Sequence, residues 1–371
     1  MKIMSLVWYN VLPAHFGGQK GIAEFNQALG QQGSLVCLCS KNNTPRGNES
    51  YGVFNWLPNS KWQIVNPLMW FAIIRFAKKQ QITHVIIEHP YYSITGWLLK
   101  ALCNCTIITH CHNVEHLLFK TRKRWYWPAI KLLETLACST SSVVICKTID
   151  DQQQLVKHCG LAAEKCMIIP FCTELKDITG KQVARRAIQK QFGLDEGQKI
   201  LLFNGTLDYE PNARAVAHLV QYLCPILPAN YTIIITGRNE FKAFARLKSL
   251  QANNLIMAGY VYDIDNYFLA ANVYINPVMD GGGMQTKNIE ALSYHLPVVC
   301  WQNRLQGIED ELTGSKIIVA KPGSWNDFLA RVLIADIIPE QTPQPFFIYY
   351  NFAYHIRLLI NRLIRPRPGV M

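Results

Sequence analysis

Three consecutive glycines, Gly281, Gly282 and Gly283, precede Lys287 and Glu290 in the segment NPVMDGGGMQTKNIEALSYHLPVV. Without side chains, such a loop lets a ligand approach the backbone closely. The pattern predicts a helix from about Met284 to Ser293, whose free N–H groups and positive dipole end bind anions. The dipole disfavours a lysine in the first turn unless an anion is bound there. The segment therefore predicts a phosphate-type anion site; the alternative is a surface Lys287–Glu290 pair behind a flexible turn.

Two further segments carry residues suited to chemistry. LPAHFGGQKGIAEF places Gly17 and Gly18 in a loop after the first apolar run, although Gly21 alone could serve to open the next helix. THCHNVEHLLFK follows an apolar run and contains His112, which could contact a substrate or be a core histidine bonded to a backbone carbonyl. As a dinucleotide fingerprint the glycine loop is incomplete, which argues against a nicotinamide dehydrogenase.

Alternating short apolar runs and helical stretches must position these residues. In the first half we expect strands at 3–7, 34–39, 84–87, 106–109, 142–146 and a last one ending at Pro170, and helices at 22–29, 68–78, 97–102 and 129–136. In the second half we expect a helix over 183–192 and strands at 200–203, 231–236, 255–257, 273–275 and 297–301. This alternation predicts parallel α/β sheets.

The two sets of runs are joined by a polar stretch from Thr173 to Lys199. We therefore expect two doubly wound, Rossmann-like domains facing each other across a cleft, over residues 1–172 and 173–335. Residues 336–371 form an apolar, basic helical segment that could pack back on the first domain. Ligands should bind in the loops after the strands.

Composition narrows the class of protein further. The 371 residues are half apolar and 17% charged, which indicates a globular chain. The net charge of +12 favours anionic partners, but no nucleic-acid-binding module is recognisable. Twelve cysteines without framework spacing are typical of reduced cytoplasmic thiols. The N-terminal run indicates a first core strand rather than a signal peptide, and we expect no membrane-spanning helix.

A metal site is not expected from the sequence. Cys103, Cys105, His110, Cys111 and His112 offer ligand types, but they lack C-x-x-C spacing and neighbours on a strand point to opposite faces.

The glycine-rich segment resembles the donor-site motif of family 4 glycosyltransferases with the GT-B fold, in the subgroup whose loop reads GGG followed by Lys and Glu-Ala. In that family the loop amides, here from Gly281 to Met284, hold the diphosphate and sugar of a nucleotide sugar. The residue matching Glu290 binds the donor ribose. Many members carry a second glutamate where this chain has Gly282.

Other segments follow in family order. FNGTLDYEPNARAV resembles the loop that opens the second domain, with Gly205 retained and Thr206 and Asn212 in place of the usual Arg and Lys. Lys287 would then supply much of the charge that faces the diphosphate. Further donor contacts implied by the resemblance are Gly237 and Arg238 in ITGRN, and Tyr260 and Val261 in AGYVYD, which would cradle the base.

In the first domain the resemblance implies that Gly17 and Gly18 face the donor phosphates and acceptor, and that His112 lies against the donor sugar. The family implies a retaining, hexosyltransferase-type enzyme that needs no metal or other cofactor. It would move a sugar from a nucleotide-diphosphate sugar to a glycan or lipid-linked acceptor in polysaccharide or glycoconjugate biosynthesis. A non-catalytic partner subunit and a nucleotide-sugar epimerase of the same fold are the alternatives.

The segment Phe119 to Lys131, FKTRKRWYWPAIK, combines five basic residues with Trp125, Tyr126 and Trp127. Aromatic rings beside Lys and Arg suit a membrane interface, so one interpretation is a cytoplasmic enzyme at the inner face of the membrane. The other is a loop whose aromatic rings pack on a neighbouring helix.

Overall fold

The computed structural model describes residues 1–14, 17–240, 247, 250–280, 284–305, 307–338 and 341–364. The chain forms two compact units, and each is described by itself. The first comprises Met1–Cys172 together with the segment from Asn351 onward, and the second comprises Thr173–Tyr350.

The first unit is a seven-stranded parallel sheet in the order β3-β2-β1-β4-β5-β6-β7. Its strands are β1 Lys2–Leu6, β2 Ser34–Ser40, β3 Gly52–Leu57, β4 His84–Glu88, β5 Thr106–His110, β6 Val143–Cys146 and β7 Cys166–Ile168. Its helices are α1 Gly17–Gln32, α2 Pro67–Lys79, α3 Ser93–Cys103, α4 Glu115–Thr121, α5 Trp127–Thr140, α6 Ile149–Cys159 and α13 Phe352–Ile364.

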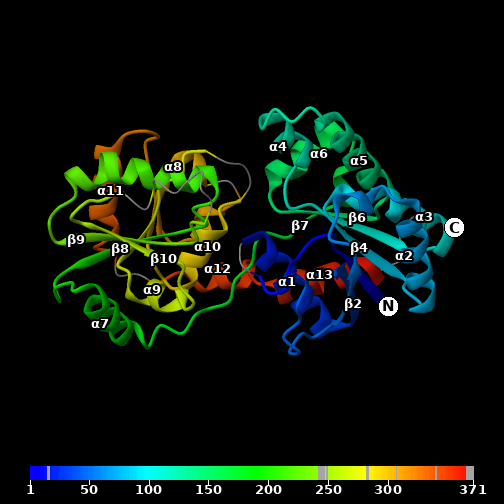
Figure 1. Ribbon diagram of the computed structural model, residues 1–371, viewed down its shortest axis with the longest axis horizontal. Coiled ribbons are helices and arrows are strands. Elements are labelled where there is room, and N and C mark those ends of the chain that lie inside the picture. The colour runs from blue at the N-terminus through cyan, green and yellow to red at the C-terminus, as the bar shows by residue number, and fades with distance from the viewer. Residues whose placement is uncertain are drawn as a thin grey trace. The chain divides into compact units, whose positions relative to one another are not determined.

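Both faces of this sheet are covered, which explains why its central strands are mostly apolar. Neighbouring residues enter different cores: Ile86 packs in the cluster with α1 and α13, and Val85 and Ile87 pack in the cluster with α2 and α3. All three side chains are fully buried. Figure 1 shows α1 and α13, the blue and red helices of this unit, side by side.

The second unit is a six-stranded parallel sheet in the order β10-β9-β8-β11-β12-β13. Its strands are β8 Lys199–Asn204, β9 Tyr231–Thr236, β10 Leu255–Gly259, β11 Val273–Asn276, β12 Val298–Trp301 and β13 Ile317–Ala320. Its helices are α7 Lys181–Phe192, α8 Glu210–His218, α9 Ile264–Ala270, α10 Thr286–Ser293, α11 Trp325–Ala335 and α12 Gln344–Tyr349. In both sheets the strand order reverses beside the first strand, as in doubly wound folds, so the predicted fold class is confirmed.

The expected end of the second domain at residue 335 is wrong, because the second unit continues to Tyr350. The helix α12 belongs to it: Phe346 and Phe347 are buried, and the Tyr350 hydroxyl accepts a hydrogen bond of 2.9 Å from the Glu309 amide. The chain then returns to the first unit, where α13 buries Phe352, Ile356 and Leu359 against the core that contains α1. The apolar face of this last helix is therefore explained by packing.

Candidate functional site

The carboxyl ends of the parallel strands of the second unit place the predicted donor residues along one edge of its sheet. Gly205 follows β8, Gly237 follows β9 and Tyr260 follows β10. Backbone hydrogen bonds tie these ends together, from the Gly205 amide to Thr236 O (3.0 Å) and from the Gly237 amide to Gly259 O (2.8 Å). Loops after β8, β9 and β10 thus form one continuous edge, as expected for parallel sheets.

Lys287 reaches this edge from α10. Its amine lies over the Phe203 ring, 4.6 Å from the centroid, and donates a 3.1 Å hydrogen bond to Asn212 Oδ1. Asn212 in turn donates to the backbone carbonyl of Thr206 at 2.9 Å. Lys287 therefore brings its positive charge to the loop after β8, in which Thr206 and Asn212 occupy the positions of the usual basic residues.

Two glycines make room for this arrangement. A Cβ on Gly205 would lie 2.8 Å from Nδ2 of Asn212 and 3.1 Å from Nζ of Lys287. Gly237 has φ of +147°, and a Cβ there would lie 1.8 Å from the Gly205 carbonyl oxygen. The residue type at both positions is thus fixed by the close approach of the loops and of Lys287.

Arg238 follows Gly237, and nearby carboxylates partly neutralise its charge. Its guanidinium lies 3.4 Å from the carboxylate of Asp208 and 3.8 Å from that of Glu240. Its backbone carbonyl accepts from the Leu207 amide at 2.8 Å, which joins the loops after β8 and β9. Arg238 therefore braces these loops, with 45% of its side chain still exposed.

The remaining predicted donor residues are placed as follows. Tyr260 is 56% exposed and stacks edge-on with Tyr262, and Val261 is partly buried between them. Met284 and Glu290 are partly buried, with Glu290 within α10 one turn beyond Lys287. Gly281, Gly282 and Gly283 lie outside the described residues.

In the first unit, His112 belongs to a hydrogen-bonded cluster at the ends of β4, β5 and β6. Its Nε2 lies 2.7 Å from Glu88 Oε2, and His110 Nδ1 lies 3.0 Å from the same oxygen. The amine of Lys147 lies 2.7 Å from Nε2 of His110. Since an ammonium has no lone pair, it donates to that nitrogen, and His110 then donates to Glu88 from Nδ1.

Burial of this cluster holds both imidazoles in the neutral form. Desolvation, followed by the charge of Lys147, lowers the pKa of His110 well below its ordinary value. Desolvation and the neighbouring histidines also lower the pKa of His112 strongly, although its bond to Glu88 acts the other way. With Nε2–H donating to Glu88, Nδ1 of a neutral His112 is a hydrogen-bond acceptor, and 9% of the side chain is exposed.

A second carboxylate supports the cluster. Glu115 accepts from Tyr91 at 2.7 Å and bonds His89 Nδ1 at 3.1 Å, and the His89 ring lies 4.6 Å from that of His112. Burial by itself would raise the pKa of Glu115, but the hydrogen bonds from His89 and Tyr91 outweigh this effect, and the pKa is lowered. His89 has φ of +65°, a costly backbone conformation for a residue other than glycine. The ring of His89 is therefore held beside His112 by specific contacts.

Gly17 and Gly18 form the first residues of α1, which begins directly after residues outside the description. Gln19 in the first turn donates to the Asn10 carbonyl at 2.7 Å, so the start of the helix is joined to the loop that follows β1.

Within the part of the chain that the structure describes, two groups of side chains offer a metal ion three ligand atoms within 4.8 Å of one another. One is Glu88, His110 and His112, and the other is His116, Glu134 and Cys159. In the first group the Lys147 amine and Glu88 hydrogen-bond both ring nitrogens of His110, so hydrogen bonding explains why these side chains lie together without a metal ion. Cys103 and Cys105 lie at the other end of β5 from His110 and belong to neither group.

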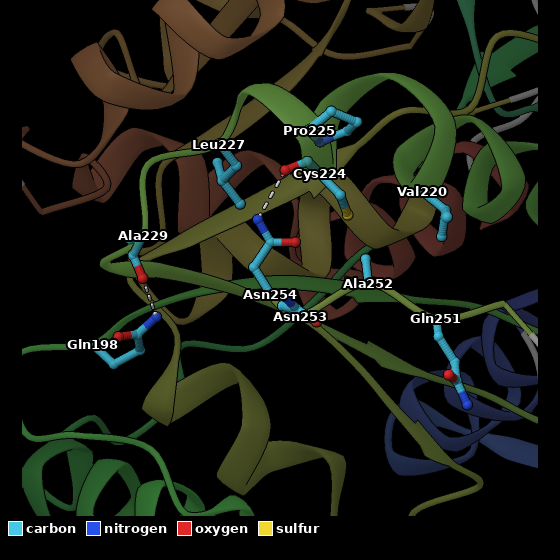
Figure 2. Close-up of a pocket in the computed structure, with 10 residues that line it drawn as sticks. All are labelled: Gln198, Val220, Cys224, Pro225, Leu227, Ala229, Gln251, Ala252, Asn253 and Asn254. Atoms are coloured by element: carbon cyan, nitrogen blue, oxygen red, sulfur yellow. Dashed lines mark hydrogen bonds between the residues drawn. The ribbon is translucent and has the colours of Figure 1, made fainter.

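A pocket of about 550 Å³ opens at the opposite edge of the second sheet, near the amino ends of β8, β9 and β10. Figure 2 shows Asn254 bonded to the Cys224 carbonyl (2.9 Å) and Gln198 bonded to that of Ala229 (3.0 Å). Among the described residues that line it, the thiol of Cys224 is the only titratable group. Because it lies away from the carboxyl ends of the strands, which the Lys287 amine reaches, it is not the predicted donor site.

The basic, aromatic segment forms the end of α4, the following turn and the start of α5. Trp125 is 88% exposed, whereas Tyr126 packs on Phe119 with ring centroids 5.3 Å apart. Lys120 lies over the Trp127 ring at 5.2 Å. Aromatic packing thus accounts for part of the segment but leaves Trp125 uncovered. Among the described residues, no helix combines the length and apolar character needed to cross a bilayer.

Sequence reasoning missed Glu88, Lys147 and the contact between Asn212 and Lys287. The signal for the first two was present, because each is the polar residue at or just after the end of a buried strand. Their pairing through His110 was not visible, since the three residues are distant in sequence.

Comparison with known proteins follows this division into units. The model named Glycosyltransferase Family 4 matches residues 17–176, and the model named Glycosyl transferases group 1 matches residues 198–335. A curated relative, the teichuronic acid biosynthesis glycosyltransferase TuaC of Bacillus subtilis, is 25% identical over 166 residues. That match spans 44% of this chain and 39% of the relative.

Solved structures share the fold at low identity. Sucrose-phosphate synthase of Thermosynechococcus elongatus aligns with a TM-score of 0.77 at 15% identity, over 98% of this chain and 99% of that one. A glycosyltransferase of Rickettsia africae gives 0.74 at 14%, over 98% and 100%. Anabaena HepE in complex with UDP gives 0.74 at 13%, over 98% and 99%. The two family models together cover most of the chain, which therefore belongs to the family 4 (group 1) glycosyltransferases and has their GT-B fold.

Proposed function

We propose that this glycosyltransferase moves a sugar from a nucleoside-diphosphate sugar to a glycan or lipid-linked acceptor in polysaccharide or glycoconjugate biosynthesis. The observation that carries the proposal is the position of the Lys287 amine, beside Gly205 and Asn212 at the carboxyl edge of the second sheet. A cation held there, in the first turn of a helix, stabilises an anionic diphosphate. HepE, which shares the fold, was solved with UDP and with UDP-glucose.

The protein would act mainly by positioning and by charge stabilisation. The bond between the sugar carbon and the diphosphate oxygen breaks, the acceptor oxygen bonds to the same carbon, and the acceptor proton passes to the leaving phosphate. Attack from the leaving-group side retains the anomeric configuration without a protein nucleophile or a metal. NMR of the product tests this step, and an inverted product would refute it.

His112 would contact the sugar through Nδ1. Its Nε2 is engaged by Glu88, and its lowered pKa keeps the ring neutral, so Nδ1 accepts a hydrogen bond from a sugar hydroxyl. This role would explain why Glu88 holds one ring nitrogen of His112 while part of the ring remains exposed.

The first experiment is a thermal-shift screen against UDP, GDP, ADP and their common sugars. A ligand at 100 times its Kd adds about 2.7 kcal/mol of stability. Lys287→Ala should weaken binding roughly 10- to 100-fold, because a hydrogen bond to a charged group contributes about 1.5–3 kcal/mol. Glu290→Ala should weaken binding through the ribose. Lys190→Ala, an exposed lysine on α7, is the matched control.

Stabilisation by one nucleotide, reduced in Lys287→Ala and unchanged in Lys190→Ala, supports the donor site and names the base. If no nucleotide stabilises the protein, the donor assignment fails. If a nucleotide binds but no acceptor is ever glycosylated, the chain is a non-catalytic partner subunit.

Trp125 and the basic residues around it fit an acceptor held at the inner face of a membrane. An exposed aromatic ring beside lysines and arginines is suited to bind an interface that carries anionic headgroups. Co-sedimentation with anionic vesicles should fall in Trp125→Ala and persist in Trp62→Ala, a second tryptophan that is 79% exposed. Equal sedimentation of both variants would contradict this role.

A further inference from the structure

The first unit gathers a second cluster of titratable side chains that the transfer reaction does not use. It lies where α4, α5 and α6 meet. A ring nitrogen of His116, a carboxylate oxygen of Glu134 and the sulfur of Cys159 lie within 4.8 Å of one another. Their exposed fractions are 2%, 1% and 5%. A carboxylate and an imidazole buried at this depth need specific partners.

A second thiol lies beside that of Cys159. Cys138 lies one turn after Glu134 on α5, is 2% exposed, and hydrogen-bonds Cys159. On the outer side, the partly exposed His158 ring stands edge-on to His116 with centroids 5.6 Å apart. Cys159 thus lies close to both a buried imidazole and a second thiol, and a partly exposed histidine lies beside that imidazole.

Glu134 fixes the orientation of His116. Its Oε1 accepts from the Glu115 amide (2.7 Å), and its Oε2 accepts from the His116 amide (3.0 Å) and bonds His116 Nδ1 (2.5 Å). This leaves Nε2 as the ring nitrogen able to bind a metal. Histidines that bind zinc commonly donate their other ring nitrogen to a carboxylate in this way.

We propose that Cys138, Cys159 and His116 bind a zinc ion, with Glu134 orienting the imidazole and His158 in the fourth position. Thiolates and imidazoles are ligand types that Zn²⁺ prefers, and a site closed by four protein ligands of this kind is structural. Binding replaces the two thiol protons, which pass to solvent, and the ion neutralises the resulting charge. The site joins α4, α5 and α6 and takes no part in sugar transfer.

The test uses the full chain, reduced and stripped with a chelator, and titrated with Co²⁺. The expected result is one equivalent of cobalt with the visible absorption of a tetrahedral site and a sulfur-to-metal charge-transfer band, both abolished by Zn²⁺. Cys138→Ser and Cys159→Ser should each lose the charge-transfer intensity and weaken binding at least about tenfold. Cys105→Ser is the control, since this buried thiol packs in another core of the same unit.

Alkylation supplies a measurement that does not depend on a variant folding. Zinc should protect Cys138 and Cys159 of the wild-type protein from iodoacetamide and leave Cys105 unaffected. Absence of stoichiometric cobalt binding, an unchanged spectrum in Cys159→Ser, or equal loss in Cys105→Ser would overturn the proposal. A Cys138–Cys159 disulfide in protein purified without reductant, with no metal bound after reduction, would overturn it too. None of these readouts depends on nucleotide binding or transfer.

Discussion

Replacing Gly205 with alanine tests whether Lys287 is positioned by packing at the strand edge. The new Cβ would lie 2.8 Å from Asn212 Nδ2 and 3.1 Å from Lys287 Nζ. Asn212 is 8% exposed and is held by its bond to the Thr206 carbonyl, so its amide cannot move aside without losing that bond. The Lys287 amine loses its acceptor at the same time.

The size of the effect follows from these two bonds. Loss of the neutral hydrogen bond between Asn212 and the Thr206 carbonyl costs about 1 kcal/mol of folding stability, and loss of the hydrogen bond from the charged Lys287 amine costs about 1.5–3 kcal/mol. In a unit of this size each kcal/mol lowers the Tm by roughly 2–4 °C. Displacement of the amine should also weaken nucleotide binding by about tenfold or more.

The assay compares thermal unfolding and nucleotide titration of Gly205→Ala with Gly197→Ala. A Cβ at Gly197 meets nothing within 4 Å, so this control carries the same change in unfolded-chain entropy without the clash. The double variant with Asn212→Ala should recover part of the stability, because the clash is removed. The reasoning is refuted if Gly205→Ala matches Gly197→Ala in both stability and nucleotide affinity.

Three further outcomes are expected. Folding lowers the pKa of His112, so the stabilising contribution of its neutral ring should be complete above about pH 6.5 and decrease as the pH drops below that value. His112→Gln should reduce this loss of stability, measured as the denaturant midpoints at about pH 7.5 and 5.5. Equal pH dependence of the variant and the wild type would contradict the prediction. Ile356→Ala should cost about 2–5 kcal/mol in chemical unfolding, because α13 buries this side chain completely, whereas Leu358→Ala, 42% exposed on the same helix, should cost far less. Gly237→Ala should unfold the second unit in circular-dichroism melts, since its Cβ meets backbone at 1.8 Å. Gly259 also has a positive φ but has free space for a Cβ, so it should tolerate alanine at a cost of about 1 kcal/mol. Equal melting temperatures of the two variants would disprove the clash.

The elements that could be read from the sequence share a simple physical property. Runs such as 231–236 are buried on both faces, so their apolar character is continuous and β9 has the predicted bounds. The strand β3 was missed because it lies at the sheet edge with Asn55 and Trp56 exposed. The strand β13 also lies at a sheet edge, and its two middle residues are only partly buried. The small helices α4 and α9 were missed because seven residues are too few to show a helical period.

By itself, the sequence determined the doubly wound class, the division after Cys172 and the strand-end positions of His112, Gly205 and Gly237, because local patterns of burial and turn residues decide these features. Only the tertiary structure decided which distant side chains meet. It placed Glu88 between two histidines, brought Lys287 to the loop that lacks the usual basic pair, and placed Cys159 close to both His116 and Cys138. Such contacts depend on strand order and helix packing, which place residues far apart in the chain within a few ångströms of one another.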